Sequence, residues 1–312
     1  MDYDWNEDQQ AIGEAVEALC TQHAGAARAI ELDAKSSWDE ALDAALVESG
    51  FAGVALGAPD TGPLEAAMLV ETLARHAATL PVGAQLLVAP KLSGSVQPGP
   101  VALVSLAHPG PVRFGSHART ALVDTGGDEA RLVSLSPGDT EPVVSNFMLP
   151  VGRVAVHAGS GEGLGAGSGP ALRAWWRVAL AAELLGTMQA ALDVTVDYTK
   201  RRRQFGRPIG SFQALQHRLA MCAVLVEGTR RLAFAAAAEE RPEESACVAA
   251  AHAADAANLL FRETHQMTGA MGFTREHDLH VFSMRLQALR LELGGASAHR
   301  RAIAATRWAR GS

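Results

Sequence analysis

Apolar side chains recur at helical spacing in the first ninety residues of the chain. Ile12, Val16 and Leu19 fall on one face of a helix with 3.6 residues per turn. Asn6 is a suitable N-cap for this helix, and the acidic residues that follow it suit a first helical turn. Glycine and proline interrupt the pattern before the third helix. The predicted helices cover residues 4–29, 38–48 and 64–77.

Helical spacing returns after Ala171 and persists to the end of the chain. Pro242 followed by Glu243 and Glu244 is typical of a helix start, because proline fixes the first helical φ and the carboxylates favour the N-terminal dipole. The predicted helices cover residues 171–202, 211–240, 243–271, 276–293 and 296–309. Long helices joined by short connections bury their apolar faces against one another, so this half of the chain predicts a helical bundle.

Short β-branched runs replace the helical pattern between Val101 and Val156, and they predict strands: VALVSL, ARTALVD, ARLVSLS and VGRVAVH. The glycines that follow, in Ala158–Pro170, are compatible with a phosphate loop. However, no Gly-Lys-Ser/Thr ends this segment and no βαβ pattern surrounds it, so a linker is favoured. The sequence predicts a mainly α fold with a reduced β insert, divided into a helical N-terminal domain (1–95), a reduced β middle domain (96–160), a Gly-rich linker (161–170) and a C-terminal four-helix bundle (171–312).

Composition excludes several classes of protein. Hydrophobic residues make up 48% of the chain and the formal net charge is −7, which gives no general attraction to nucleic acid or to an anionic membrane. Cys20, Cys222 and Cys247 have neither metal-ligand nor disulfide spacing and are expected in the core. His277 and His280 lack a third ligand at a recognisable spacing, so no metal site is predicted. The acidic N-terminal segment and the absence of an uninterrupted apolar run of membrane-spanning length predict a cytoplasmic protein without membrane contact.

One segment, Asp197–Leu219, combines the features of a phosphate site. Four consecutive cations, Lys200 to Arg203, close one predicted helix, and a Pro/Gly turn leads to the start of the next helix near Ser211. The open amides of a helix start, together with nearby cations, suit a phosphate-bearing ligand. The alternative is a solvated helix end whose cations complement the helix dipole.

The same segment, YTKRRRQFGRPIGSFQALQHRLA, resembles the signature of the acyl-CoA dehydrogenase family, in which Tyr and Arg precede Gln-Phe-Gly, and Ile and Phe-Gln follow. A second segment, HQMTGAMGFTREHDL, is similar to the family's Gln-x-x-Gly-Gly-x-Gly-Tyr/Phe-Thr segment. MDYDWNEDQQAI and GFAGVALGAPDTG also resemble family openings. The resemblance implies a helical N-domain, a β middle domain, a C-terminal helical bundle, and FAD-dependent α,β-desaturation of an acyl-CoA.

In this family the ADP half of FAD is held by the neighbouring subunit, through its Arg-x-Gln-Phe-Gly segment and its Gln-x-x-Gly-Gly turn. Arginine can fork onto phosphate oxygens, and small residues let backbone amides approach a ligand. Ala270 stands where the family usually has glycine. By position, the resemblance implies Arg202 at the pyrophosphate, Gln204 and Phe205 at the diphosphate and adenine, Ile209, Phe212 and Gln213 beyond them, and Gln266, Gly269 and Ala270 on a second contact surface.

The family's catalytic base, a glutamate, is absent from both of its usual positions. Counting from the second motif places one of these positions at Leu293, and aligning the helix before the first motif places the other at Trp176. Neither side chain can accept a proton from carbon. Glu292 is expected to point elsewhere. Glu183 is on the same helix face as Trp176 and is the only nearby carboxylate that could serve as a relocated base.

Two segments hold the flavin ring in the family: LAHPGP (Leu106–Pro111) is the only candidate remnant of the first, Thr-Glu-Pro then Gly-Ser-Asp, and the second, Trp-Ile-Thr/Ser-Asn, is missing from the middle domain. Such a chain resembles the smaller subunit of the α2β2 acyl-CoA dehydrogenases of actinobacterial steroid side-chain degradation. The implied partners are a larger acyl-CoA dehydrogenase subunit that shares the FAD, an acyl-CoA substrate such as a steroid side-chain thioester, and electron-transfer flavoprotein as the acceptor. The alternatives are a flavin-free structural homologue and a self-sufficient dehydrogenase with Glu183 as its base.

Overall fold

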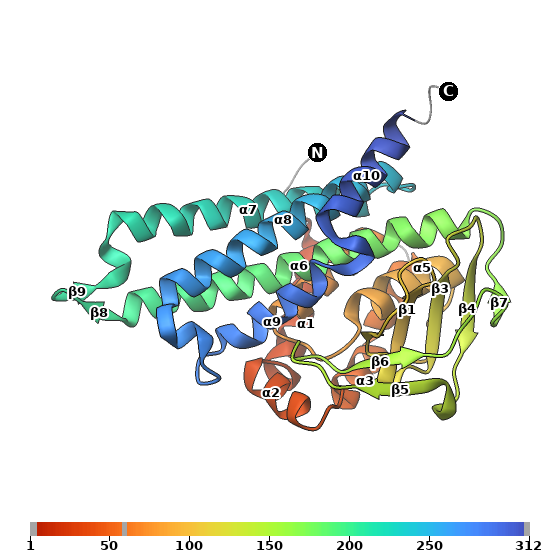
Figure 1. Ribbon diagram of the computed structural model, residues 1–312, viewed down its shortest axis with the longest axis horizontal. Helices are drawn as coiled ribbons and strands as arrows, with labels where there is room; N and C mark the ends of the chain where they lie inside the picture. The colour runs from red at the N-terminus through yellow and green to blue at the C-terminus, as the bar shows by residue number, and fades with distance from the viewer. Residues whose placement is uncertain (1–4, 58–60, 309–312) are drawn as a thin grey trace.

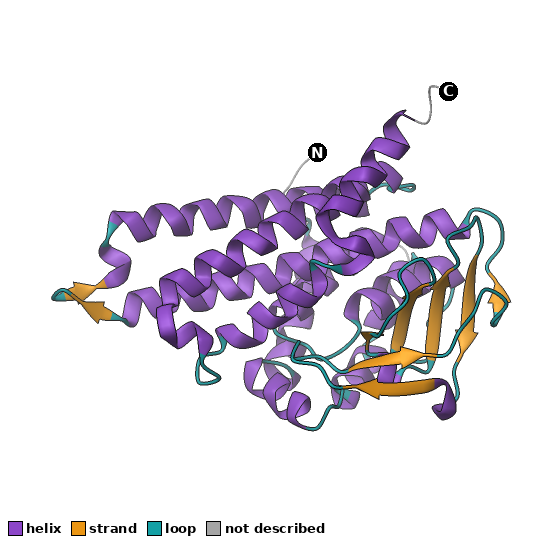
Figure 2. Ribbon diagram, in the orientation of Figure 1, coloured by secondary structure: helices purple, strands orange, loops and turns teal. Residues whose placement is uncertain are grey.

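Figure 1 shows long helices that run side by side along the longest axis of the molecule, with a layer of strands at one end. Helix is the dominant secondary structure outside that layer (Figure 2). The computed structural model describes residues 5–57 and 61–308. The predicted helix ends at residues 4 and 309, and the parts of the two N-terminal resemblances at residues 1–4 and 58–60, lie outside the described residues.

Short helices form the N-terminal region: α1 (Glu7–His23), α2 (Ala26–Ala34), α3 (Glu40–Glu48), the 3-10 helix η1 (Phe51–Leu56), α4 (Pro63–Arg75), the π-helix η2 (Ala84–Val88) and α5 (Ala89–Ser93). Asn6 caps α1 as predicted, since its side chain accepts the Gln9 N–H at 2.8 Å and the Gln9 side chain accepts the Asn6 N–H at 3.1 Å. The single helix predicted over residues 4–29 is wrong. Gly25 has a φ of 128°, which no helix can continue through, so α1 and α2 are separate.

Two small sheets follow in the chain. One has the strand order β1 (Val101–Ser105), β3 (Thr120–Asp124), β4 (Ala130–Ser134), β7 (Glu162–Gly163), and the other β2 (Val112–Arg113), β6 (Val151–Val154), β5 (Thr140–Val143). The four predicted runs correspond to β1, β3, β4 and β6. The parallel pair β1 and β3 is buried along its whole length, as strands covered on both faces are. The segment predicted as a linker, 161–170, instead contains β7 and the beginning of the next helix.

The C-terminal half contains α6 (Ser168–Arg201), the hairpin β8 (Arg203–Gln204) and β9 (Arg207–Pro208), η5 (Ile209–Ser211), α7 (Gln213–Ala237), α8 (Glu243–Thr268), η6 (Gly269–Phe273), α9 (Leu279–Leu289), η7 (Glu292–Gly294) and α10 (Gly295–Trp308). Helix α6 is central and packs against α4, α7, α8 and α9. It is long and apolar enough to cross a membrane, but 83% of its most apolar window is buried inside the protein. The predicted mainly α fold, with a β insert and a C-terminal helical bundle, is confirmed.

Gly186 lies where α6 of the bundle closely approaches α4 of the N-terminal region. A Cβ at this position of α6 would lie 2.1 Å from the Glu71 carbonyl oxygen and 2.8 Å from the Arg75 backbone nitrogen, both on α4. Only glycine therefore permits this backbone approach. Side chains of α1, α4, α6, α8 and α9 consequently belong to one hydrophobic core.

Candidate functional site

The Arg-x-Gln-Phe-Gly segment forms a hairpin that projects from the end of the bundle opposite the sheets (Figure 1). Phe205 and Gly206 form its turn and have φ values of 54° and 78°. Two consecutive positive φ values are the requirement of a type I′ hairpin turn, whose twist matches that of the flanking strands. The Phe205 side chain is 90% exposed, so the hairpin presents it to the surroundings of the molecule.

The residues around the hairpin leave several polar groups open. Arg202, at the end of α6, is exposed, and the described residues provide no ion-pair partner for Arg202, Arg203 or Arg207. The Arg207 guanidinium lies 4.0 Å above the ring of Phe212, which stands immediately before α7. No side chain caps the start of α7. Arginines without carboxylates, next to open helix amides, fit a diphosphate group.

The second predicted contact surface lies at the same end of the bundle. Gln266 is exposed near the end of α8, and Gly269 ends that helix with a φ of 59°. Ala270 lies in η6 without a positive φ, so the alanine that replaces the family glycine strains no backbone here. Tyr198, in the last turn of α6, packs edge-on against His277 with ring centroids 5.3 Å apart, which holds the segment after η6 against the end of α6. The structure therefore brings both predicted surfaces to one end of the bundle, while their roles remain predictions.

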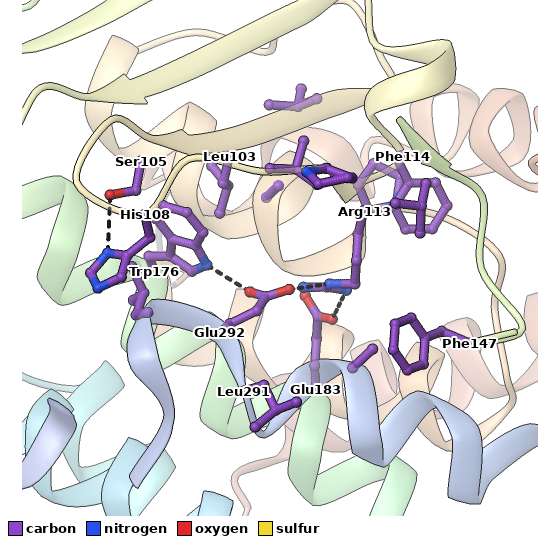
Figure 3. A pocket seen from close by; sticks show the side chains of 18 residues that line it. Leu103, Ser105, His108, Arg113, Phe114, Phe147, Trp176, Glu183, Leu291 and Glu292 are labelled. Atoms are coloured by element: carbon purple, nitrogen blue, oxygen red, sulfur yellow. Dashed lines mark hydrogen bonds and ion pairs between the residues drawn. The ribbon is translucent and has the colours of Figure 1, made fainter. Parts of the chain in front are cut away.

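A cavity of about 230 Å³ lies elsewhere, where β1 and β2 face the N-terminal half of α6 and η7 (Figure 3). Its lining includes the residues at the two predicted base positions and two carboxylates: Trp176, Leu293, Glu183 and Glu292. Arg201 lies about 27 Å further along α6 than Glu183, at roughly 1.5 Å per residue. Within one chain, the cavity and the hairpin are therefore too far apart to contact the same chemical group of a ligand.

A network of charged side chains crosses this cavity (Figure 3). Arg113, from β2, donates from Nη1 to Glu183 Oε2 at 2.6 Å and from Nε to Glu292 Oε1. The Trp176 indole donates to Glu292 Oε2 at 2.9 Å, and the Gly83 N–H donates to Glu183 Oε1 at 3.1 Å. Both oxygens of each carboxylate are therefore occupied by donors within the chain.

Burial and the attraction between opposite charges together set the pKa values in the network. Burial raises the pKa of Glu183 above its ordinary value, and the attraction of Arg113 offsets this only in part. The two carboxylates raise the pKa of Arg113 although burial opposes them, so the guanidinium stays charged. Nearby, burial and the charge of Arg113 lower the pKa of Arg285 to about 10. Arg285 donates to the Ala78 carbonyl at 2.8 Å and has no carboxylate partner among the described residues.

The residues at the two base positions are both buried in this cavity wall. Leu293 has φ 50° and ψ 29°, a left-handed conformation that is rare for a bulky side chain and that is found where surrounding structure enforces it. Trp176 donates a hydrogen bond and accepts none. The expectation that Glu292 points elsewhere is wrong, because the Glu292 carboxylate points into the cavity and accepts from Arg113.

Sequence reasoning missed Arg113, although a signal was present. It stands between apolar neighbours in the run Val112–Phe114, and a cation in such a run requires a buried counter-ion. Glu183 stands in an Ala- and Leu-rich stretch of α6 and has the same requirement. A search for isolated buried charges of opposite sign would have paired these two residues.

Comparisons with known proteins agree with this architecture. Residues 173–308 match the family model "Acyl-CoA dehydrogenase, C-terminal domain". Acyl-CoA dehydrogenase IpdE2 of Mycobacterium tuberculosis is 32% identical over 296 residues, covering 89% of this chain and 91% of that protein. A chain of the ChsE4-ChsE5 complex from Mycobacterium tuberculosis has a TM-score of 0.82 at 23% identity over 100% of both chains. A chain of the Tcur3481-Tcur3483 steroid ACAD has a TM-score of 0.83 at 26% identity, over 96% of this chain and 97% of that one.

The helical bundle with an interposed β layer is thus the fold of a class of FAD-binding dehydrogenases, and the acyl-CoA dehydrogenase-like fold class predicted from the sequence is confirmed. This chain belongs to the acyl-CoA dehydrogenase family.

Proposed function

We propose that this chain is the non-catalytic subunit of a heteromeric acyl-CoA dehydrogenase. It contributes the ADP-side contacts to an FAD whose ring and catalytic base lie on a larger partner subunit. The observation that carries this proposal is the separation of the hairpin from the cavity along α6. FAD, when bound, supplies the hydride acceptor for α,β-desaturation.

The chain's own cavity does not fit the flavin ring and the acyl thioester, the groups that react. Its volume of about 230 Å³ is below the range of roughly 300–1,000 Å³ that is usual for pockets enclosing drug-sized ligands. Arg113 and two carboxylates cross the space, and the two base positions hold Trp176 and Leu293. These features favour chemistry on another chain.

The hairpin end, in contrast, fits the ADP half of FAD. Arg202 would hold pyrophosphate oxygens, and the open amides at the start of α7 would add donors to the same anion. The backbone at Gly269 and the Gln266 amide would form the second contact surface. Each of these groups binds and orients, and none of them takes part in proton or hydride transfer.

The similar proteins support the proposal of a partner subunit and of a steroid thioester as substrate. ChsE4-ChsE5 is a complex, and Tcur3481-Tcur3483 is a steroid ACAD. We infer an α2β2 assembly with a larger acyl-CoA dehydrogenase subunit, a steroid side-chain CoA thioester as substrate, and electron-transfer flavoprotein as acceptor.

Co-expression with a neighbouring, larger acyl-CoA dehydrogenase gene tests the proposal. The co-purified complex is expected to contain FAD, and Arg202→Ala is expected to weaken FAD binding roughly 10- to 100-fold, because hydrogen bonds to charged groups are worth about 1.5–3 kcal/mol. Arg301→Ala is the matched control, since Arg301 is an exposed arginine on α10. Unchanged flavin content in the Arg202 variant would instead support a flavin-free assembly role.

A self-sufficient dehydrogenase with Glu183 as base is the second candidate. It is favoured by the position of Glu183 in the cavity wall and by its raised pKa, which suits a general base. The donors Arg113 and Gly83 on both carboxylate oxygens argue against it. The lone chain decides between the candidates: stoichiometric flavin absorbance, together with acyl-CoA oxidation that Glu183→Gln abolishes, would establish the second.

A further inference from the structure

Three aromatic rings contact one another at the hairpin end of the bundle, in the segment where α8 passes into η6, and two of them, His265 and Phe273, form a stack. His265 lies between Phe273 and Phe261: its ring centroid is 4.4 Å from that of Phe273, nearly parallel at 28°, and 4.6 Å from that of Phe261. His265 is 5% exposed, whereas Phe273 is 73% exposed. An aromatic ring that is fixed from below by stacking and open above is a ready binding face.

The buried histidine is unusual in its hydrogen bonding. Neither ring nitrogen of His265 has a hydrogen-bond partner among the described residues. A buried polar group without a hydrogen-bond partner costs desolvation free energy, so other contacts must offset this cost where His265 is stacked. Burial, and then the charge of His277, lower the pKa of His265, so its ring is neutral and stacks as a flat, uncharged aromatic.

Gly272 allows the turn to close over this histidine. A Cβ at Gly272 would lie 2.1 Å from Thr268 Oγ1 and 3.2 Å from His265 Nδ1. With glycine there, η6 carries Phe273 onto the face of the imidazole. The orientation of the exposed ring is therefore set by the backbone as well as by the stack.

The surroundings indicate what this face binds. The contact between Tyr198 and His277 joins the segment after η6 to the last turn of α6, four residues before Arg202. Arginines without carboxylate partners attract phosphate, and an exposed aromatic platform stacks on a base. A cationic cluster beside such a platform therefore matches a nucleotide with both an anionic and an aromatic part.

We propose that Phe273, supported from below by His265, is the platform on which the adenine ring of the shared FAD stacks. This inference rests on the proposed function, because it assigns a residue to the ADP side of that cofactor. It adds Phe273 as a binding residue and His265 as the residue that positions it.

Titration of the flavin-depleted complex with FAD and with FMN tests the inference. Phe273→Ala is expected to weaken FAD binding about tenfold or more, the effect of removing one base-stacking aromatic. FMN lacks the adenine, so its binding is expected to be unchanged. Phe273→Tyr is expected to retain wild-type affinity for FAD. Trp308→Ala is the control, because Trp308 is 71% exposed at the end of α10.

Three outcomes overturn the inference: wild-type FAD affinity in Phe273→Ala, an equal loss of FAD and FMN affinity, or dissociation of the complex without a change in its intrinsic flavin affinity. If Arg202→Ala loses FAD while Phe273→Ala does not, only the platform is wrong and the proposed function stands. A wild-type complex that binds no FAD overturns both.

Discussion

Replacing Arg113 by methionine removes the one cation that Glu183 and Glu292 share. The side chains of Arg113 and Glu183 are 16% and 6% exposed, so water cannot take the place of the lost partner. Breaking a buried ion pair by deleting one member costs about 3–5 kcal/mol, because the remaining charge is left uncompensated. We expect Arg113→Met to lower the free energy of unfolding at pH 8 by this amount.

The effect is expected to depend on pH. The pKa of Glu183 is already raised in the folded protein above its ordinary value of 4.5, so its stabilising contribution is present below that value and is lost as the pH rises through the raised pKa. Without Arg113 the folded-state pKa rises further. The variant should therefore lose less stability at pH 5, closer to the range in which Glu183 takes up a proton, than at pH 8.

Urea unfolding of the wild type and the variant at both pH values measures this difference. Arg307→Met is the control, because the Arg307–Glu244 pair is 58% and 34% exposed and a surface pair contributes up to about 1 kcal/mol. The triple variant with Glu183→Gln and Glu292→Gln added should recover most of the loss, since the amides still accept from Gly83 and Trp176. An equal loss at pH 5 and pH 8, without recovery in the triple variant, would refute the electrostatic reasoning.

Two further predictions concern packing and a buried histidine. Gly186→Ala should destabilise the protein by about 1–3 kcal/mol, because its methyl meets the α4 backbone. Gly13→Ala, in open space on α1, should instead raise the thermal midpoint, and a Gly186→Ala variant as stable as the wild type would contradict the close crossing. Burial, and then Arg177, lower the pKa of His299 to about 4, so unfolded chains bind a proton there that folded chains exclude, and stability falls as the pH drops from 7 to 4. His299→Gln should remove up to roughly 3 kcal/mol of this pH dependence in unfolding titrations, and an unchanged profile would show that His299 is protonated in the fold.

The helices were predictable because their apolar spacing and end signals are local in sequence. The central helix predicted over residues 171–202 is observed as Ser168–Arg201, and the cap at Asn6 is present. Short strands are harder to recognise, since β2 and β7 have two residues each and show no alternation. The break at Gly25 was missed because the helical spacing continues across it.

The cavity network was not predictable, because it depends on contacts between distant segments. Arg113 is 70 residues from Glu183 and 179 from Glu292 in the chain. Leu293, next to Glu292, has a left-handed φ, a conformation that a leucine does not signal. The two base positions predicted from the family register, Trp176 and Leu293, lie in one cavity wall, but the register gave no information on which charges fill that cavity.

The turn at Phe205 and Gly206 also has a thermodynamic consequence. The type I′ turn and the two residue pairs between its strands give the hairpin a defined backbone geometry in the chain without ligand or partner subunit. A disordered loop with the same residues would lose conformational entropy on binding, and that loss would weaken the affinity. Preorganisation therefore lets a small number of exposed side chains on a two-residue turn contribute nearly their full interaction energy to whatever they bind.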